Sequence, residues 1–255
     1  MEYLLAFTFG AVIGSFLNVC IFRLPAGQSI VSPASRCPAC GTPVRSHDNV
    51  PILSYMLLHG RCRDCRSPIS LRYPAVEALT GFMFVLLLYR IGPLPILAVD
   101  AAFVAALIVL SFIDLDHQII PDVISLPGIA IGLLLSTLGY GPALVDSALG
   151  VLVGGGLLYA VAIGYHALTG REGMGGGDIK LLAMIGAFLG WKNVLLTLVL
   201  GSLSGALVGI GLILVRGDDR KVPIPFGPFL AVGALCALLF GDPLIHWYLN
   251  LAIPS

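Results

Sequence analysis

The stretch LPILAVDAAFVAALIVLSFI, residues 94–113, is apolar apart from Asp100 and Ser111, and it ends directly at Asp114. Its length matches the roughly 20 residues that an α-helix needs to cross the hydrocarbon core of a bilayer. A carboxylate beside lipid is costly, so by default it marks a functional site. The stretch therefore predicts a membrane helix that carries an acidic side chain at one end.

The composition extends this prediction to the whole chain. Of its 255 residues, 58% are hydrophobic and only 11% are charged, and the mean hydropathy is +0.98. A soluble domain of this size would need far more charge on its surface. The net charge is zero, with 14 basic and 14 acidic residues, so the basic footprint of a nucleic-acid-binding protein is absent.

Repeated apolar runs predict an all-α, polytopic membrane protein of about eight transmembrane helices. The runs lie at 3–22, 73–89, 94–113, 123–138, 143–168, 179–189, 194–215 and 226–240. The first run has no basic segment before it and no cleavage site after it, so we expect a retained helix. The sixth is short and is expected to tilt or to merge with the seventh near Gly190. A last stretch, 244–253, is expected at the membrane interface, and no internal repeat is evident.

The basic residues predict the orientation of the chain. With eight spans, all Lys and Arg side chains except Arg90 and Lys192 fall on one side, and half of them lie within residues 23–72. The positive-inside rule then places the N-terminus outside and the 23–72 loop in the cytoplasm. Asp114 and Asp178 both fall at the cytoplasmic face.

Four of the six cysteines form two Cys-x-x-Cys pairs in this polar loop: Cys37, Cys40, Cys62 and Cys65. Four thiolates favour tetrahedral zinc, with iron as the main alternative. Disulfides are disfavoured because cytoplasmic thiols stay reduced, and a thioredoxin-like redox site would need a βαβ unit that the pattern lacks. The metal would stabilise a loop too small to fold alone and would have no catalytic role.

The sequence thus divides into a first transmembrane helix at 1–22, a cytoplasmic zinc-binding domain at 23–72 and a membrane-embedded helical bundle at 73–255. Glu77 lies near the start of the bundle. We expect it to stabilise its helix by pairing with an arginine such as Arg72 rather than to act in catalysis.

Asp178 follows the glycine-rich run 173–177, which would let an extended peptide lie close to the backbone. A helix N-cap is the simpler role for Asp178. A phosphate loop would need a preceding strand and the Walker spacing, and both are missing. Near Asp114, Asp116 points to another face and suits a solvated charge, and Asp122 suits the first turn of a helix.

Asp114 and Asp178 together supply the two carboxyl groups that an aspartyl protease requires. Two carboxyl groups that share one proton can activate a water molecule and protonate the leaving amine. The competing interpretation is a membrane scaffold or transporter whose carboxylates conduct ions near the bilayer midplane. Here both carboxylates lie at the ends of apolar runs, which argues against it.

Several longer motifs make the chain resemble the bacterial type IV prepilin peptidases. They occur in order along nearly the whole chain: GSFLNVCIFRLP at 14–25, SRCPAC at 35–40, DNVPILSY at 48–55, GRCRDC at 60–65, ISLRYPAVE at 69–77, DLD at 114–116, IPD at 120–122 and GMGGGDIK at 173–180. The last contains the Gly-x-Gly-Asp pattern, which is similar to that of presenilin-type intramembrane proteases. Each motif alone is weak, but the ordered set is specific.

The resemblance implies that Asp114 and Asp178 are the catalytic pair and that the four cysteines hold structural zinc. The implied substrates are type IV prepilins or type II secretion pseudopilins, cut after a leader glycine at the cytoplasmic face of the bacterial inner membrane. The new N-terminal residue, usually Phe, is then methylated with S-adenosylmethionine, for which no binding residues are indicated. Gly176 is the one departure, because family members often carry a larger residue there. A protease without methyl transfer stays open as an alternative.

Overall fold

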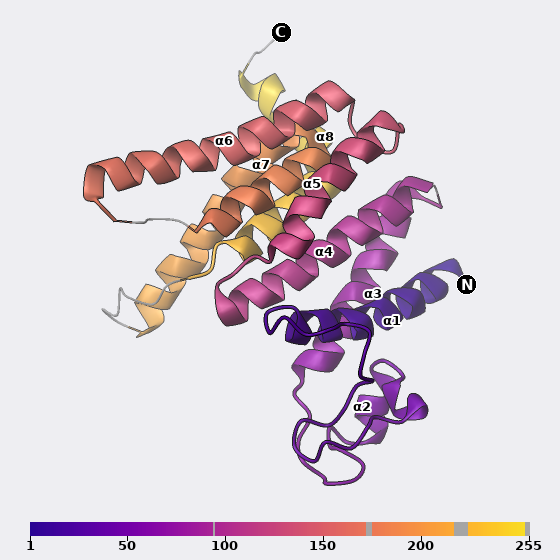
Figure 1. Cartoon of the computed structure of the whole chain (residues 1–255). Helices are drawn as coiled ribbons and strands as arrows, with labels where there is room; N and C mark the ends of the chain where they lie inside the picture. Colours follow the sequence, from indigo (N-terminus) through magenta and orange to yellow (C-terminus); the bar gives the residue numbers. More distant parts are fainter. Residues whose placement is uncertain (94, 172–174, 217–223, 253–255) are drawn as a thin grey trace. The chain divides into compact units, whose positions relative to one another are not determined.

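A computed structural model describes residues 1–93, 95–171, 175–216 and 224–252 (Figure 1). Its regular elements are helices, and within these ranges the chain forms isolated bridges but no β-strand. The chain divides into two compact units, Met1–Val109 and Leu110–Ser255. The prediction of an all-α protein is therefore confirmed.

The first unit is built on α1 (Glu2–Arg23) and α3 (Arg72–Ile91), which pack against each other. Small residues let the two backbones approach closely: a Cβ atom added at Gly14 would lie 2.7 Å from the Cα atom of Glu77. Such close approach is typical of helix pairs in membranes, where packing replaces the hydrophobic effect.

The loop between α1 and α3 contains two short helices, and the first part of α4 also belongs to this unit. The two short helices are η1 (Ser46–Asn49) and α2 (Leu53–Leu57), and α4 extends over Pro95–His117.

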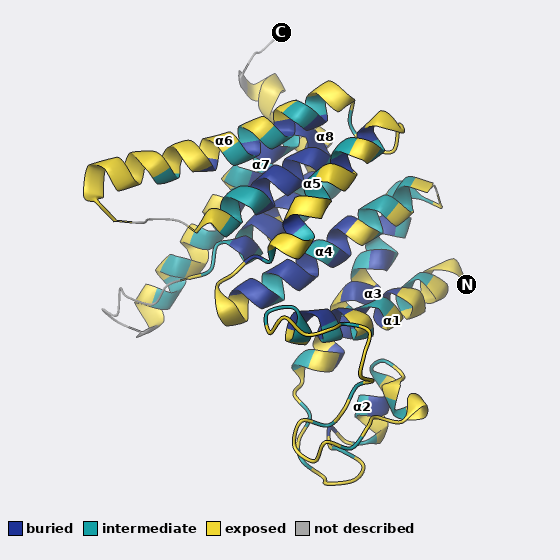
Figure 2. Cartoon of the chain, in the orientation of Figure 1, coloured by how far each residue is buried: buried dark blue, intermediate teal, exposed yellow. Residues whose placement is uncertain are grey.

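The second unit contains the end of α4 and four further helices. They are α5 (Asp122–Thr137), α6 (Leu144–Thr169), α7 (Gly176–Arg216) and α8 (Gly227–Ala252). Helix α7 packs against α5, α6 and α8. Buried residues concentrate in the first half of α7, whereas most of α6 is exposed (Figure 2). The exposed side chains are largely apolar, as expected of a surface that faces lipid.

Within the part of the chain that the structure describes, six helices are long and apolar enough to cross a membrane, and α5 is a shorter apolar helix of 16 residues. Gly190, with φ 78° and ψ 170°, interrupts the helical backbone of α7 and divides it in two. Each of the eight predicted runs therefore has a counterpart. The described part of the stretch 244–253 is not separate, because α8 continues through Pro243 to Ala252; its place at the membrane interface stays a prediction.

Helices α6 and α7 touch through their backbones. A Cβ atom at Gly150 would clash with the carbonyl group of Gly186, and one at Gly154 would lie 2.5 Å from the carbonyl oxygen of Leu182. The hydroxyl of Ser147 donates a hydrogen bond to the carbonyl oxygen of Ala187 at 2.5 Å. Glycines four residues apart thus form the α6 contact surface.

Gly150→Leu is expected to destabilise the second unit strongly, because the added side chain has no room beside α7. Overpacking of a close interface costs about 1–3 kcal/mol, and more when backbones must separate. Gly156→Leu is the matched control, since that glycine lies on the same helix with open space around it. Melting temperatures in detergent would measure the difference. Equal melting temperatures would contradict the close packing of α6 and α7.

Candidate active site and metal centre

Asp114 lies in the last turn of α4 and is buried, with 5% of its surface exposed. The backbone N–H of Gly227, the first residue of α8, donates a hydrogen bond to Asp114 Oδ2 at 2.9 Å. A charge-assisted bond of this kind stabilises an ionised carboxylate where water is scarce. The carboxyl group is thus held in place by a backbone donor far away in the sequence.

Asp178 lies in the first turn of α7 and is partly buried. Its carboxyl group is close enough to Asp114 for the two charges to interact. Ile120 connects the two segments: a Cβ atom at Gly177 would lie 3.0 Å from Ile120 Cβ, and one at Gly227 would lie 3.3 Å from Ile120 Cδ1. The structure therefore brings together the two aspartates that the sequence singles out.

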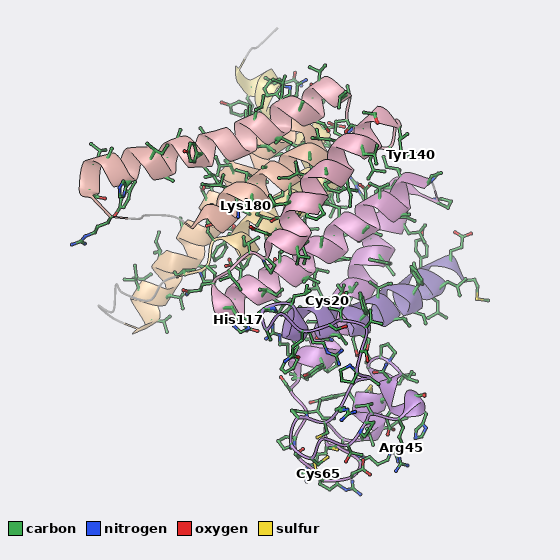
Figure 3. All side chains as sticks on the ribbon, in the orientation of Figure 1. Cys20, Arg45, Cys65, His117, Tyr140 and Lys180 are labelled. Atoms are coloured by element: carbon green, nitrogen blue, oxygen red, sulfur yellow. The ribbon has the colours of Figure 1, made fainter. Side chains whose placement is uncertain are left out.

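Asp122 begins α5, as expected of a first-turn residue, and it forms an ion pair with Lys180. The Lys180 Nζ atom lies 2.6 and 2.8 Å from the two carboxylate oxygens of Asp122. Lys180, which is labelled in Figure 3, lies two residues after Asp178 in the sequence, so this ion pair connects the start of α5 to the start of α7. Asp116 is exposed, as predicted. Of the predicted glycine-rich run, residues 173 and 174 lie outside the described residues.

Gly227 is a site residue that the sequence analysis missed. A Cβ atom there would lie 2.6 Å from Asp114 Oδ2 and 3.2 Å from Asp114 Cγ. The only local hint is its position before Pro228 at the start of an apolar run, which suits any helix start.

Gly227→Ala is expected to displace the Asp114 carboxyl group and to lower the cleavage rate by roughly 10²-fold, the cost of a misplacement of about 1 Å. Gly211→Ala is the matched control, because a Cβ atom there would meet open space. Single-turnover cleavage of a substrate, measured at equal protein amounts, checks the difference. Unchanged cleavage by Gly227→Ala would show that the position of this carboxyl group is unimportant.

The four predicted cysteines, Cys37, Cys40, Cys62 and Cys65, come together. Their sulfur atoms all lie within 4.8 Å of one another, and Cys37 Sγ is 3.8 Å from Cys65 Sγ. A tetrahedral Zn²⁺ with bonds of ~2.3 Å separates its sulfurs by ~3.8 Å. None of the six cysteines forms a disulfide. The donor set and its spacing fit a four-thiolate metal site in the loop that contains Arg45 (Figure 3).

The two halves of this metal site repeat each other, so the prediction of no internal repeat is wrong. The segments RCPACGTP at 36–43 and RCRDCRSP at 61–68 share the pattern Arg-Cys-x-x-Cys-x-(Thr/Ser)-Pro. In each, the N–H of the first cysteine donates to the carbonyl of the Thr or Ser, and the first and last residues form an isolated bridge. The repeat is too short to stand out among the apolar runs.

The backbone of the first segment favours a thiolate. The N–H groups of Cys40 and Ala39 lower the pKa of the Cys37 thiol to about 6. In the second segment, the Ser67 hydroxyl and backbone lower the pKa of Cys65. A thiolate is the form that binds metal, so the local geometry supports this use of Cys37 and Cys65, whereas the pKa of Cys62 is raised.

A polytopic helical membrane protein with two neighbouring carboxylates at helix ends has the arrangement of an intramembrane aspartyl protease. The chain belongs to the type IV leader peptidase family, whose model matches residues 101–210. The model of the bacterial peptidase A24 N-terminal domain matches residues 8–91. Together these matches include both aspartates and all four loop cysteines.

Curated relatives are similar over nearly the whole chain. A prepilin leader peptidase/N-methyltransferase of Aeromonas hydrophila is 41% identical over 98% of this chain and 94% of its own length. Proteins of the same name are 40% identical in Pseudomonas putida, over 93% of this chain and 90% of the relative, and 37% identical in Pseudomonas aeruginosa, over 95% and 92%. No solved structure matches the chain significantly.

Proposed function

We propose that this chain cleaves the leader peptides of prepilins with Asp114 and Asp178 and then methylates the new N-terminus. The observation that carries this proposal is that Gly177, next to Asp178, and Gly227, whose N–H binds Asp114, both pack against Ile120. Family membership and the relatives' shared name support both activities. The substrates are type IV prepilins or type II secretion pseudopilins, and the protein resides in the bacterial inner membrane.

The two carboxyl groups perform the hydrolysis by dividing one proton between them. The ionised partner removes a proton from a water molecule, and the water oxygen bonds to the scissile carbonyl carbon. The protonated partner donates a hydrogen bond to the carbonyl oxygen and then passes its proton to the leaving amine. Asp114 enters this step already oriented by the Gly227 N–H, which reduces the reorganisation that the reaction requires.

The metal in the loop is zinc, held by Cys37, Cys40, Cys62 and Cys65. The fit of the sulfur spacing to tetrahedral zinc supports this assignment. Four protein ligands leave no open position for water or substrate. Zinc therefore supplies folding free energy to residues 23–72 rather than chemistry.

The loop and the active site face the cytoplasm, and the N-terminus lies outside. Twelve of the 14 Lys and Arg residues, all but Arg90 and Lys192, support this orientation. It places the carboxyl groups where the basic leader of a prepilin enters the bilayer. A transporter would instead place its carboxylates on helices broken near the midplane, and Asp114 and Asp178 both lie in terminal turns.

Mass spectrometry of a prepilin co-expressed with this protein tests the proposal. We expect a product that lacks its leader and is heavier by one methyl group than the bare mature chain. An empty vector is the control for cleavage by the host. A cleaved but unmethylated product would reduce the function to the protease alone, and an intact prepilin would contradict the proposal.

A further inference from the structure

The first unit contains a cavity of about 900 Å³ between the end of α1, the start of α3 and the metal-binding loop. Its volume lies in the upper range of small-molecule sites, which is roughly 300–1,000 Å³. The lining includes three carboxylates, several aromatic residues and two of the candidate metal ligands; among them are Asp48, Asp64, Glu77, Tyr55, Tyr73, Cys37 and Cys62. The proposed hydrolysis uses none of these groups.

Glu77 is the carboxylate in this cavity that lacks a cation. It lies in the second turn of α3 with only 8% of its surface exposed. The Ile52 N–H donates to Glu77 Oε2 at 2.8 Å, but within the described ranges no ion pair with Arg72 or any other cation forms. A buried carboxylate normally has a charged partner. A cationic ligand group would supply it.

Asp48, another carboxylate of the cavity, already has a cationic partner. Arg63 forms a bidentate ion pair with it, with Nε 2.8 Å from Asp48 Oδ2 and NH2 2.5 Å from Oδ1. This pair lowers the pKa of Asp48 and links η1 to the second metal-binding segment. The acidic residues of the cavity thus differ: Asp48 and Asp64 form ion pairs with Arg63 and Arg45 of the loop, whereas Glu77 forms no ion pair among the described residues.

The backbone opposite Glu77 is strained. Ile52 has φ 63° and ψ −51°, and a hydrogen bond of 2.5 Å from the Leu53 N–H to the Pro51 carbonyl closes a tight γ-turn around it. A positive φ is rare for a β-branched residue, and such turns persist where the surroundings hold them, often at ligand sites. Here the Glu77 carboxylate holds the turn through the Ile52 N–H.

We propose that this cavity binds S-adenosylmethionine, with Glu77 facing its sulfonium cation. The inference deepens the proposed function, on which it rests. The rings of Tyr55 and Tyr73 offer aromatic surface for the adenine and for the cation. The remaining volume can admit the N-terminal residue of the cleaved substrate.

Methyl transfer in this cavity balances without a further reactant. The unprotonated amine nitrogen of the new N-terminus bonds to the methyl carbon while the carbon–sulfur bond breaks, and that electron pair stays on the sulfur as S-adenosylhomocysteine forms. The positive charge moves from sulfur to nitrogen, which keeps both of its protons as a methylammonium group. Glu77 therefore lies beside a positive charge both before and after the methyl transfer.

Isothermal titration of the metal-loaded, full-length protein in detergent, with S-adenosylmethionine and with uncharged S-adenosylhomocysteine, tests the proposal. In Glu77→Gln we expect the affinity for S-adenosylmethionine to fall by about tenfold or more, the value of a hydrogen-bonded charge. The affinity for S-adenosylhomocysteine should fall much less. Glu2→Gln, the same change at an exposed position of α1, is the matched control. The amide can still accept the Ile52 N–H, and metal content reports on folding.

An equal affinity for S-adenosylmethionine in Glu77→Gln and wild type would overturn the proposal, and so would an equal loss for both compounds. Ultraviolet cross-linking of radiolabelled S-adenosylmethionine to the wild type adds a second readout. Label in peptides from residues 15–77 supports the cavity, and label confined to the rest of the chain overturns it. A wild type that cleaves prepilin but binds no S-adenosylmethionine would instead refute the methyltransferase part of the proposed function.

Discussion

Asp114→Asn and Asp178→Asn are each expected to lower the rate of leader cleavage by roughly 10³-fold or more, because catalytic groups that act as a unit fail together. Asparagine has nearly the same shape as aspartate and can still accept the Gly227 N–H at position 114. It cannot take a proton from water or pass one to the leaving amine. The loss would therefore reflect chemistry rather than packing.

The double variant sharpens this prediction. If the two carboxyl groups share one proton, removing both should cost little more than removing one. Asp116→Asn is the matched control, since Asp116 lies two residues from Asp114 but is exposed, and it should cleave at the wild-type rate. The measurement is the cleavage rate at equal amounts of folded protein. Full cleavage by either single variant would exclude that aspartate from the reaction.

Loss of the loop metal has the second large expected effect. The apparent free energy of binding to a four-thiolate zinc site is about 10–16 kcal/mol, which exceeds the stability of most small domains. Cys37→Ser and Cys62→Ser should therefore release the metal and unfold much of residues 23–72. Bound metal measured by plasma mass spectrometry, and the rate at which a protease cuts the loop, would report the change.

Cys236→Ser is the control for this experiment, because Cys236 lies in α8, outside the metal site. It should retain one equivalent of metal and a protected loop. Iron in place of zinc would contradict the zinc assignment while retaining the four-thiolate site. A loop that stays protected without any metal would show that its own contacts suffice.

The helices could be predicted because each apolar run is a local signal. A membrane helix satisfies its backbone hydrogen bonds within itself, so its length and position follow from the residues of one segment. The apolar runs do not, however, mark every helix boundary. Gly190 interrupts α7 without ending the apolar pattern, and α8 continues through Pro243 to Ala252.

The candidate site was predicted in part for the same reason. The spacing within each Cys-x-x-Cys pair is local, and the four cysteines were named correctly as one cluster. The partner of Glu77, in contrast, could not be predicted from the neighbouring residues. Its position suggested an ion pair within the helix, whereas its carboxylate accepts a hydrogen bond from Ile52, 25 residues earlier.

By itself the sequence determined that this is a helical membrane protein with two acidic groups at helix ends and a four-cysteine loop. These properties depend on composition and short spacings. Only the tertiary structure decided that the backbone of Gly227 orients Asp114 across 113 residues, and that Glu77 faces a cavity beside the strained turn at Ile52. Backbone N–H groups are the same in every residue except proline, so contacts that use them between distant segments leave no pattern in the sequence.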